Sequence, residues 1–379
     1  MNARKITRRR ALASLAAATA ASGGSGISMA LAQGFAGLGT AADGFALPDR
    51  GRALVFPADH GAHPRFRIEW WYLTANLTTA DGREGGIQWT LFRAALAPEG
   101  PHSGWRSPQV WLGHAGVTLP GQHLHAEVLA RGGIGQAGVR ATPFAGWIDD
   151  WEMRDPRAAL PPAETIAATE GDALDTLTLH ASGTHFSYRL GLRAEGPLVL
   201  QGDAGYSVKS PAGQASHYYS QPFYRVEGVL RLPDEDVTVS GQGWLDREWS
   251  SQPLADTQDG WDWISLHLDT GAKMMGFRLR DRAGAPFTSA TFIAPTGAET
   301  PYSDGALAMT PLEWVPVAGR DVPIRWRAVL PAEGIDVTLS AVEPNAWMAT
   351  TTPYWEGPVR IAGSHGGRGY LEMTGYAPG

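Results

Sequence analysis

The sequence contains no cysteine among its 379 residues. This absence excludes a disulfide framework, a thiolate zinc site, an iron–sulfur cluster, a cysteine nucleophile and a lipid anchor on cysteine. Charged residues are also few, at 18%, whereas hydrophobic residues reach 43%, a composition typical of a globular protein with ample core material. Beyond the N-terminal segment no stretch is long and apolar enough to cross a bilayer, so we expect no transmembrane segment in the mature chain.

Basic residues are too few to suggest a nucleic-acid partner. The whole chain has a net charge of -7, and beyond residue 32 there are 26 basic residues against 38 acidic ones. Neutralising phosphates requires clustered cations, which this balance does not supply. We therefore expect no nucleic-acid binding.

Turn-forming and aromatic residues are abundant. The 47 glycines and 27 prolines follow no G-x-y period, which excludes collagen. Tryptophan, with 15 residues, outnumbers both phenylalanine and tyrosine. No segment sustains a 3.6-residue hydrophobic period, so these features predict an all-β chain of short strands with large aromatic surfaces.

Residues 1–32 have the pattern of an export signal. Arg8, Arg9 and Arg10 directly precede an alanine-rich run, and Ala30-Leu31-Ala32 supplies an A-x-A cleavage pattern. Paired arginines before the apolar run predict twin-arginine export and a periplasmic or secreted mature protein. The alternative is a frayed basic tail. Residues 33–52, rich in glycine and alanine, are expected to form a flexible leader.

Two halves of the chain repeat one pattern. The segment 70–77 (WWYLTANL) aligns with 261–268 (WDWISLHL), and each precedes a turn and a strand containing Phe-Arg. A second similarity relates 241–246 (GQGWLD) to 369–372 (GYLE), preceded by Glu-Gly in each half. This order predicts tandem β domains, residues 53–238 and 239–379. Closure into two antiparallel β-barrels would hide the sheet edges, and a sandwich is the alternative.

Asp246 is the strongest candidate for chemistry. In GWLDREWSS (243–251) it shares one strand face with Trp244 and Glu248, while Arg247 and Trp249 share the other. A carboxyl between indoles is poorly solvated and could act as a general acid near neutral pH. The structural alternative pairs Asp246 with an arginine, or lets Glu248 cap a turn.

A second polar and aromatic cluster covers residues 205–220. Lys209 could supply a cation and His217 a proton carrier, while Tyr218 and Tyr219 could donate hydrogen bonds inside a cavity. Ser216 beside His217 does not indicate a catalytic triad, because neighbours on a strand point in opposite directions. The chain also lacks a G-x-S-x-G nucleophile elbow.

Other clusters have structural interpretations. Glu69, Trp70 and Trp71 are expected to plug a barrel base, with Glu69 holding an arginine, and Glu356 is expected to do the same in the second half. The pairs His60/His63 and His123/His125 lack a third ligand at a recognisable spacing, so we expect no metal site. No phosphate loop or dinucleotide fingerprint is present, and the expected chemistry requires no cofactor.

Several motifs together resemble the AttH/carotenoid 1,2-hydratase family of lipocalin-like secreted proteins. They are EWWY (69–72), GYSVK (205–209), ASHYYSQP (215–222), GWLDREWSS (243–251), GWDW (260–263), YWEG (354–357) and GYLEMTGY (369–376). The resemblance spans roughly residues 53–377 and implies two lipocalin-like barrels. In the hydratase branch an aspartate, at the position of Asp246, protonates a terminal carotenoid double bond. There it lies in a segment resembling His-Asp-His, whereas Leu245 and Arg247 flank it here, which places this chain nearer the AttH branch.

We therefore expect an exported protein that binds a hydrophobic isoprenoid, carotenoid or lipid-like molecule. The leading hypothesis is an acid-catalysing hydratase (hydro-lyase) or hydrolase with Asp246, His217 and Tyr219 as catalytic residues. The expected ligand-binding residues are Trp244, Trp249, Trp261, Trp263, Tyr218, Lys209 and Arg278. The alternatives are a non-catalytic periplasmic carrier, which the family resemblance links to an ABC-transporter system, and a structural surface factor without a cavity.

Overall fold

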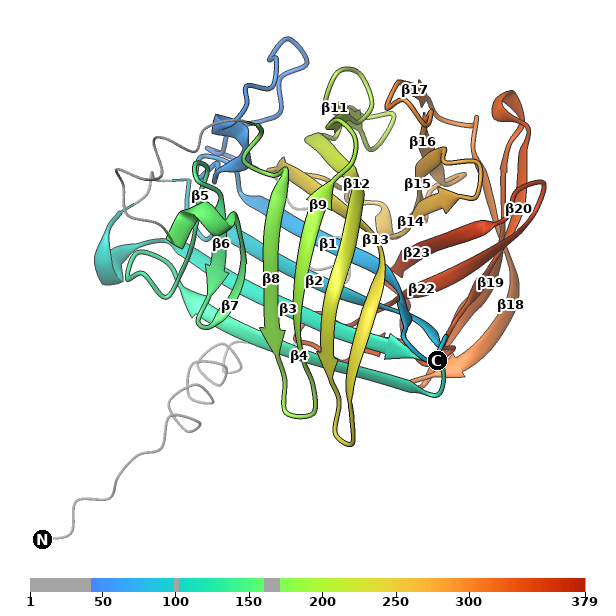
Figure 1. Ribbon diagram of the computed structural model, residues 1–379. Coiled ribbons are helices and arrows are strands. Elements are labelled where there is room, and N and C mark those ends of the chain that lie inside the picture. Colours follow the sequence, from blue (N-terminus) through green and yellow to red (C-terminus); the bar gives the residue numbers. More distant parts are fainter. Residues whose placement is uncertain (1–41, 99–101, 160–170, 379) are drawn as a thin grey trace, which may run out of the picture.

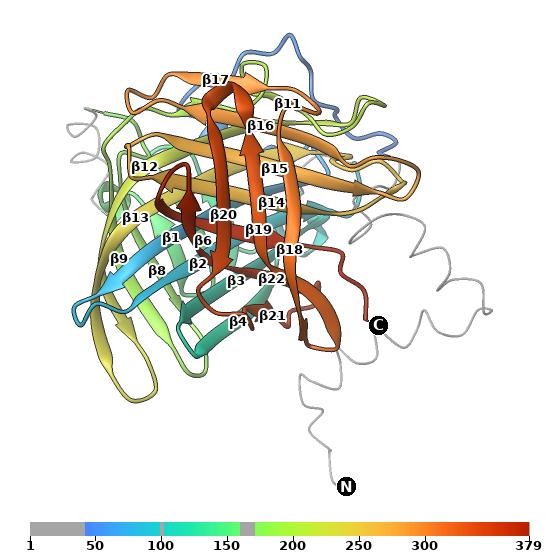
Figure 2. The same cartoon turned by 90° about the vertical axis from the view of Figure 1, so that its right-hand side faces the viewer.

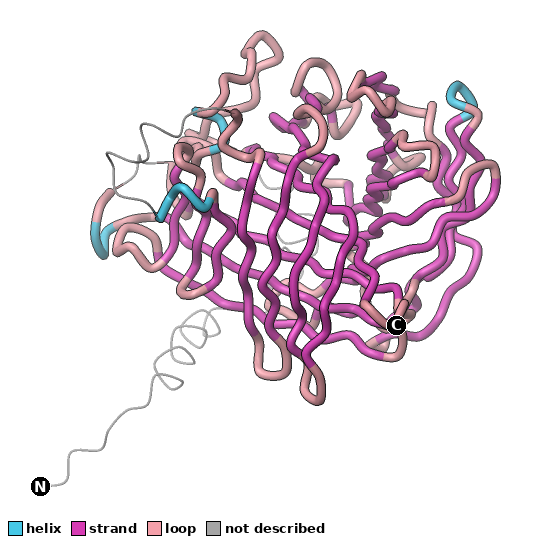
Figure 3. Tube along the Cα trace, viewed as in Figure 1, coloured by secondary structure: helices cyan, strands magenta, loops and turns pink. Residues whose placement is uncertain are grey.

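The computed structural model describes residues 42–98, 102–159 and 171–378 (Figure 1). Within these residues the chain consists almost entirely of strands, as predicted, and no α-helix occurs (Figure 3). Its helical segments there are short 3-10 turns, at Ala58–His60, Gly104–Arg106, Pro156–Ala159 and Pro331–Glu333. The predicted export signal, residues 1–32, and the first part of the predicted leader lie outside the described residues.

The strands form two antiparallel sheets. The first has the order β4-β3-β2-β1-β13-β12-β9-β8-β7-β6-β5, with β10 and β11 also paired to β12. Its strands are β1 Ile68–Thr79, β2 Glu84–Ala95, β3 Gln109–Leu119, β4 Gln122–Arg131, β5 Ala137–Arg140, β6 Ala145–Ile148, β7 Trp151–Arg154, β8 Thr176–Ser182, β9 Ser187–Ala194, β10 Val199–Leu200, β11 Tyr206–Val208, β12 Ala215–Arg231 and β13 Asp236–Ser250.

The second sheet has the order β17-β16-β15-β14-β23-β22-β20-β19-β18, with β21 paired to β22. Figure 2 looks onto this sheet, with β18, β19 and β20 running nearly upright. Its strands are β14 Gln258–Leu268, β15 Lys273–Asp281, β16 Phe287–Ile293, β17 Glu299–Tyr302, β18 Ala308–Val317, β19 Arg320–Leu330, β20 Ile335–Ala341, β21 Trp347–Met348, β22 Tyr354–Gly363 and β23 Gly367–Met373.

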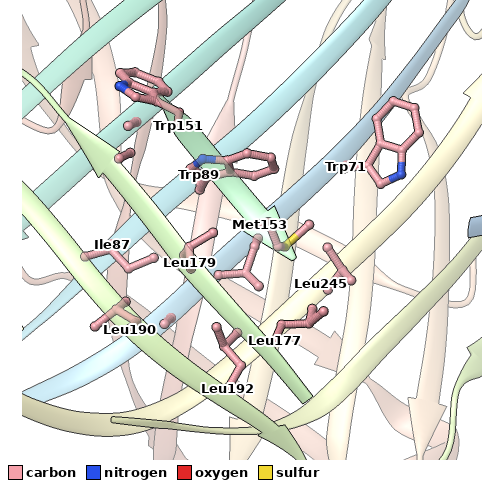
Figure 4. Close-up of a cluster of buried hydrophobic side chains, with 14 of the residues drawn as sticks. Trp71, Ile87, Trp89, Trp151, Met153, Leu177, Leu179, Leu190, Leu192 and Leu245 are labelled. Atoms are coloured by element: carbon pink, nitrogen blue, oxygen red, sulfur yellow. The ribbon is translucent and has the colours of Figure 1, made fainter. Parts of the chain in front are cut away.

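Each sheet curls into a barrel or half-barrel, which confirms the predicted tandem architecture. In the first sheet the curling brings β6 against β2, β3 and β4. Each curled sheet encloses its own hydrophobic core; the first contains Trp71, Trp89, Trp151 and leucines from β8, β9 and β13 (Figure 4). The second core is built around Trp326, Trp347 and Trp355. Because curling turns one face of each sheet inward, the two cores remove many large side chains from water.

A third hydrophobic cluster lies between the two sheets. It combines Tyr72 and Trp244 of the first sheet with Trp263, Phe277 and other residues of the second. The central strand β1 is therefore covered on both faces, and seven consecutive residues, 71–77, are buried. On β9, which has one face to solvent, buried and exposed residues alternate.

The boundary between the sheets lies after the segment that the sequence predicted as the domain junction. Strand β13 pairs with β1 on one side and β12 on the other, so the first sheet extends to Ser250. The predicted boundary at 238/239 falls inside this strand. The second sheet begins at Gln258. No helix among the described residues has the length and hydrophobicity needed to span a membrane.

Candidate functional site

A cavity of about 280 Å³ lies between the two sheets. Its walls are mostly apolar, and they contain polar groups at a few positions only. The first sheet and the loop regions next to it contribute Ile68, Trp70, Tyr72, Phe92, Ala94, Leu112, His114, Lys209, Tyr218, Asp246, Glu248, Pro253 and Leu254. The second sheet and its loops contribute Trp261, Trp263, Phe277, Leu279, Thr352, Tyr354, Glu372 and Thr374.

Asp246 lies in the wall of this cavity, and three side chains donate hydrogen bonds to it. Ser220 Oγ and Trp244 Nε1 donate to Oδ1 over 2.5 and 2.7 Å, and Tyr218 Oη donates to Oδ2 over 2.7 Å. The Tyr218 hydroxyl in turn accepts a hydrogen bond from Trp263 Nε1 of the second sheet. This network fixes the carboxyl between the sheets.

The environment of Asp246 favours its protonated form. Burial raises the pKa of this carboxyl to about 7, although the hydrogen bonds from Ser220, Tyr218 and Trp244 offset part of the rise. The nearby Glu248 adds to the rise. A carboxyl that titrates near neutral pH can hold a proton and still release it, as a general acid must.

Lys209 and Glu248 form an ion pair at the cavity wall, with Nζ 2.9 Å from Oε1. The Lys209 ammonium also lies 4.3 Å from the ring centroid of Phe277 and 4.9 Å from that of Tyr218. Both partners of the pair are nearly buried, so the attraction is screened little by solvent. The pair places one cation and one further carboxylate beside Asp246.

The predicted catalytic residues His217 and Tyr219 do not lie beside Asp246. Side chains alternate along β12, so Tyr218 and Ser220 point to the side of Asp246 while His217 and Tyr219 point to the opposite side. Tyr219 Oη lies 2.7 Å from His60 Nδ1, and His217 Nε2 accepts a hydrogen bond from the Asp49 amide. Burial lowers the pKa of His217 to about 4.

Two predicted ligand-binding residues also lie away from the cavity. Trp249 packs in the first core and stacks on His63, with ring centroids 4.0 Å apart. Arg278 forms an ion pair with the buried Asp262, 2.8 Å away, whereas its neighbour Phe277 lines the cavity. Trp261, Trp263, Tyr218 and Lys209 line it as the sequence analysis proposed, and Trp244 hydrogen-bonds Asp246.

The group predicted as a barrel plug is divided between two faces of β1. Glu69 is fully buried between Arg93 and Arg247, and burial would raise its pKa, but the two arginines lower it overall. Arg247 stacks on Trp71, 3.8 Å from the ring centroid. Trp70 points the other way and lines the cavity. The ion pairs of Glu69 therefore lie inside the first barrel, whereas the cavity lies outside it.

Glu356 is buried beside the cavity. It accepts a hydrogen bond of 2.5 Å from the Tyr72 hydroxyl. Burial and the charge of Glu372 raise the pKa of Glu356 well above the ordinary value, and the hydrogen bonds from Tyr72 and Tyr354 oppose this rise. Glu356 thus joins the two sheets through one hydrogen bond.

Glu372 is a cavity carboxyl that sequence reasoning missed. It accepts a hydrogen bond from Trp261 Nε1 and faces the cavity from β23. Burial raises its pKa to about 7, the Trp261 hydrogen bond opposes the rise, and the charges of Asp246 and Glu248 add to it. The similarity between GWLD (243–246) and GYLE (369–372) was a signal that could have found it.

No group of three or more His, Asp or Glu side chains in the described parts of the chain is arranged to hold a metal ion. His123 and His125 stack on each other with ring centroids 5.6 Å apart. His60 and His63 instead contact buried side chains of the first barrel, namely Tyr219 and Trp249.

Comparison with known proteins gives one family and two structural relatives. The sequence profile of a family described as AttH-like matches residues 47–376. A crystal structure from Nitrosomonas europaea, provisionally described as AttH, is similar with a TM-score of 0.74 and 31% identity, over 88% of this chain and 100% of that one. Kievitone hydratase from Nectria haematococca has a TM-score of 0.62 at 14% identity, over 88% of this chain and 98% of that one. No curated protein sequence matches the chain.

Proposed function

The chain belongs to the AttH-like family, and from the cavity of this member we propose a hydratase that adds water to a carbon–carbon double bond of a hydrophobic small molecule. Asp246 is the proton donor. The observation that carries this proposal is a carboxyl with a pKa of about 7 in the wall of an apolar cavity. The fold shared with kievitone hydratase supports a reaction of this class.

Protonation of an alkene by Asp246 leaves a positive charge on the neighbouring carbon. The indoles of Trp70, Trp261 and Trp263 line the same cavity. An indole face stabilises a cation by roughly 0.5–2 kcal/mol. The fixed side chains of the cavity wall would also determine where the attacking water approaches.

The size of the cavity restricts the substrate. The volume of the cavity is about 280 Å³. This space suits the unsaturated end of an isoprenoid or carotenoid rather than a complete long chain. The apolar lining would bind that end by removing its hydrocarbon surface from water.

The experiment uses kievitone and the acyclic carotenoid lycopene as probes, incubated with the protein in oxygen-18 water. We expect mass spectrometry to find one of them enlarged by one labelled water. Asp246→Asn should abolish this product, because an amide cannot donate the proton as an acid does. Asp336→Asn, an exposed aspartate paired with Arg327, is the matched control and should hydrate normally.

Other outcomes identify the alternatives. Labelled fragments would show hydrolysis, in which the same acid protonates a leaving group. A probe that co-purifies with the protein and returns unchanged would show a carrier, which could serve an ABC-transporter system. In that case Asp246→Asn would alter affinity modestly, and the hydratase proposal would be wrong.

A further inference from the structure

The two sheets share the order of their central strands. In each, four consecutive strands run outward as a meander, β1 to β4 in the first sheet and β14 to β17 in the second. In each, the last long strand returns to pair with the first, β13 with β1 and β23 with β14 (Figures 1 and 2). The sequence similarity between residues 70–77 and 261–268 therefore reflects strands at equivalent places.

Asp246 and Glu372 occupy equivalent positions in these two sheets. Asp246 of β13 lies opposite Tyr72 of β1, and Glu372 of β23 lies opposite Trp263 of β14. Tyr72 and Trp263 are themselves equivalent in the repeat. Because the cavity lies between the sheets, this repeat brings one carboxyl from each half to the same cavity.

We infer that Glu372 is a second catalytic carboxyl, which accepts the proton of the water molecule that attacks the substrate. This inference rests on the proposed hydration. The Asp246 O–H bond breaks and its proton forms a C–H bond with the alkene electron pair. Water then forms the C–O bond, and its released proton passes to the Glu372 carboxylate. Return of that proton to Asp246 restores the site, so one water is added and no other reactant is needed.

The charges of the two carboxyls support opposite roles. The negative charge of one raises the pKa of the other, which disfavours ionisation of both at once. One proton shared between two such groups gives an acid and a base in the same site. Lys209 is already paired with Glu248 at 2.9 Å, so this cation is engaged by another carboxylate.

Glu372 is connected to a series of titratable side chains. The Tyr72 hydroxyl interacts with Glu372 and donates to Glu356 over 2.5 Å. Tyr354 also lies close enough to Glu356 to lower its pKa. Asp246 is hydrogen-bonded by Ser220, Tyr218 and Trp244, and the Tyr218 hydroxyl continues to the indole N–H of Trp263.

The series continues to the surface. The Tyr354 hydroxyl lies 3.0 Å from His114 Nδ1, and His114 Nε2 lies 3.1 Å from Glu127 Oε1. The Glu127 side chain is 18% exposed. The carboxyl that accepts a proton is thus the one with a side-chain route toward solvent, which fits the role assigned to Glu372.

The test compares Glu372→Gln with Asp246→Asn in the labelled-water assay, repeated in D₂O. We expect Glu372→Gln to hydrate the probes roughly 100-fold more slowly or worse, the usual contribution of acid–base catalysis. Its recovered probe should nevertheless carry deuterium, because Asp246 still protonates the alkene and the cation loses a proton again. Asp246→Asn should give neither product. Glu313→Gln, an exposed glutamate of β18, should behave as wild type.

The outcomes separate this inference from the proposed function. If Glu372→Gln hydrates within a few-fold of wild type while Asp246→Asn does not, the role of Glu372 is overturned and hydration stands. If wild type neither hydrates nor exchanges deuterium, the proposed function is contradicted. The interaction between Asp246 and Glu372 is then tested separately, by following the carboxyl titrations of the protein without substrate by ¹³C NMR. There, Asp246→Asn must lower the pKa of Glu372; an unchanged titration overturns the pairing.

Discussion

At the residue scale, the surroundings of Asp246 raise the pKa of an ordinary aspartate until it titrates near neutral pH. Asp246 receives three hydrogen bonds that favour its charged form, yet enclosure between two sheets outweighs them. On the opposite face of the sheet, Arg247 of β13 and Glu69 of β1 are equally enclosed but neutralise each other. The difference lies in the partner: hydroxyl and indole donors for Asp246, an oppositely charged group for Glu69.

This environment predicts a pH-dependent stability. The folded protein retains the Asp246 proton up to about pH 7, whereas the unfolded chain releases it near the ordinary pKa of 3.8. Between these values the folded state binds more protons, so the free energy of unfolding falls as pH rises. Asp246→Asn should reduce this slope by up to about 1.4 kcal/mol for each pH unit.

Urea unfolding at a series of pH values between 4 and 8 measures the slope. Glu372 has the same sign and a similar range, so the variant should flatten the profile without removing its slope. A constant loss of stability is also expected, because the new amide hydrogens would face donors. Identical slopes for variant and wild type would show that Asp246 is not protonated in the folded state.

At the element scale, the contact between the sheets depends on a small residue in β2. A Cβ at Gly86 would lie 2.7 Å from the Ala75 carbonyl oxygen and 2.7 Å from the ring of Tyr370 in β23. Real Cβ atoms do not approach so closely, so β2 and β23 can pack together only because Gly86 has no side chain. Tyr370 is almost fully buried and has little room to move.

Gly86→Ala should therefore destabilise the protein by about 1–3 kcal/mol, the usual cost of overpacking. Gly284→Ala is the matched control, because a Cβ there meets no atom within 4 Å and the backbone is not in the left-handed region. Thermal and urea unfolding of both variants check this. Equal stability of the two would mean that the sheets are not in close contact at Gly86.

At the scale of the whole molecule, the functional site belongs to neither barrel alone. Each barrel fills its inside with its own core, and the cavity forms where the outer faces of β1 and β13 meet β14 and β23. Because the two halves repeat one strand pattern, each half supplies an aromatic wall and a carboxyl to this site. Trp70 and its cross-strand neighbour Phe92 in one half correspond to Trp261 and its cross-strand neighbour Leu279 in the other, and all four line the cavity.

We also propose that the chain is exported through the twin-arginine route, which would carry it across the membrane already folded. Replacing Arg8 and Arg9 by lysines should retain the protein in the cytoplasm, because that route reads the arginine pair. Cell fractionation with an antibody to the mature chain measures the distribution. Unchanged periplasmic or secreted protein would contradict this route.

The sequence by itself determined the all-β class, the main hairpins, the repeat and the candidate acid. These depend on local patterns: aromatic and turn residues, strand alternation and the WLD motif. Alternation also placed Asp246 and Glu248 together on one face of β13, opposite Arg247 and Trp249. The same rule, applied to β12, separates Tyr218 from His217 and Tyr219.

Only the tertiary structure decided which face of each strand meets the cavity. The pattern of a strand buried on both sides, such as β1, does not distinguish a barrel interior from an interface, because both are apolar. Alternation puts Trp70 on the face opposite Glu69, and Trp249 on the face opposite Trp244, but it does not say which of the two faces meets the cavity. Glu372 lines the same cavity as Asp246 because the two sheets pack together, although these two residues lie more than a hundred positions apart in the sequence. No local pattern specifies such a long-range contact.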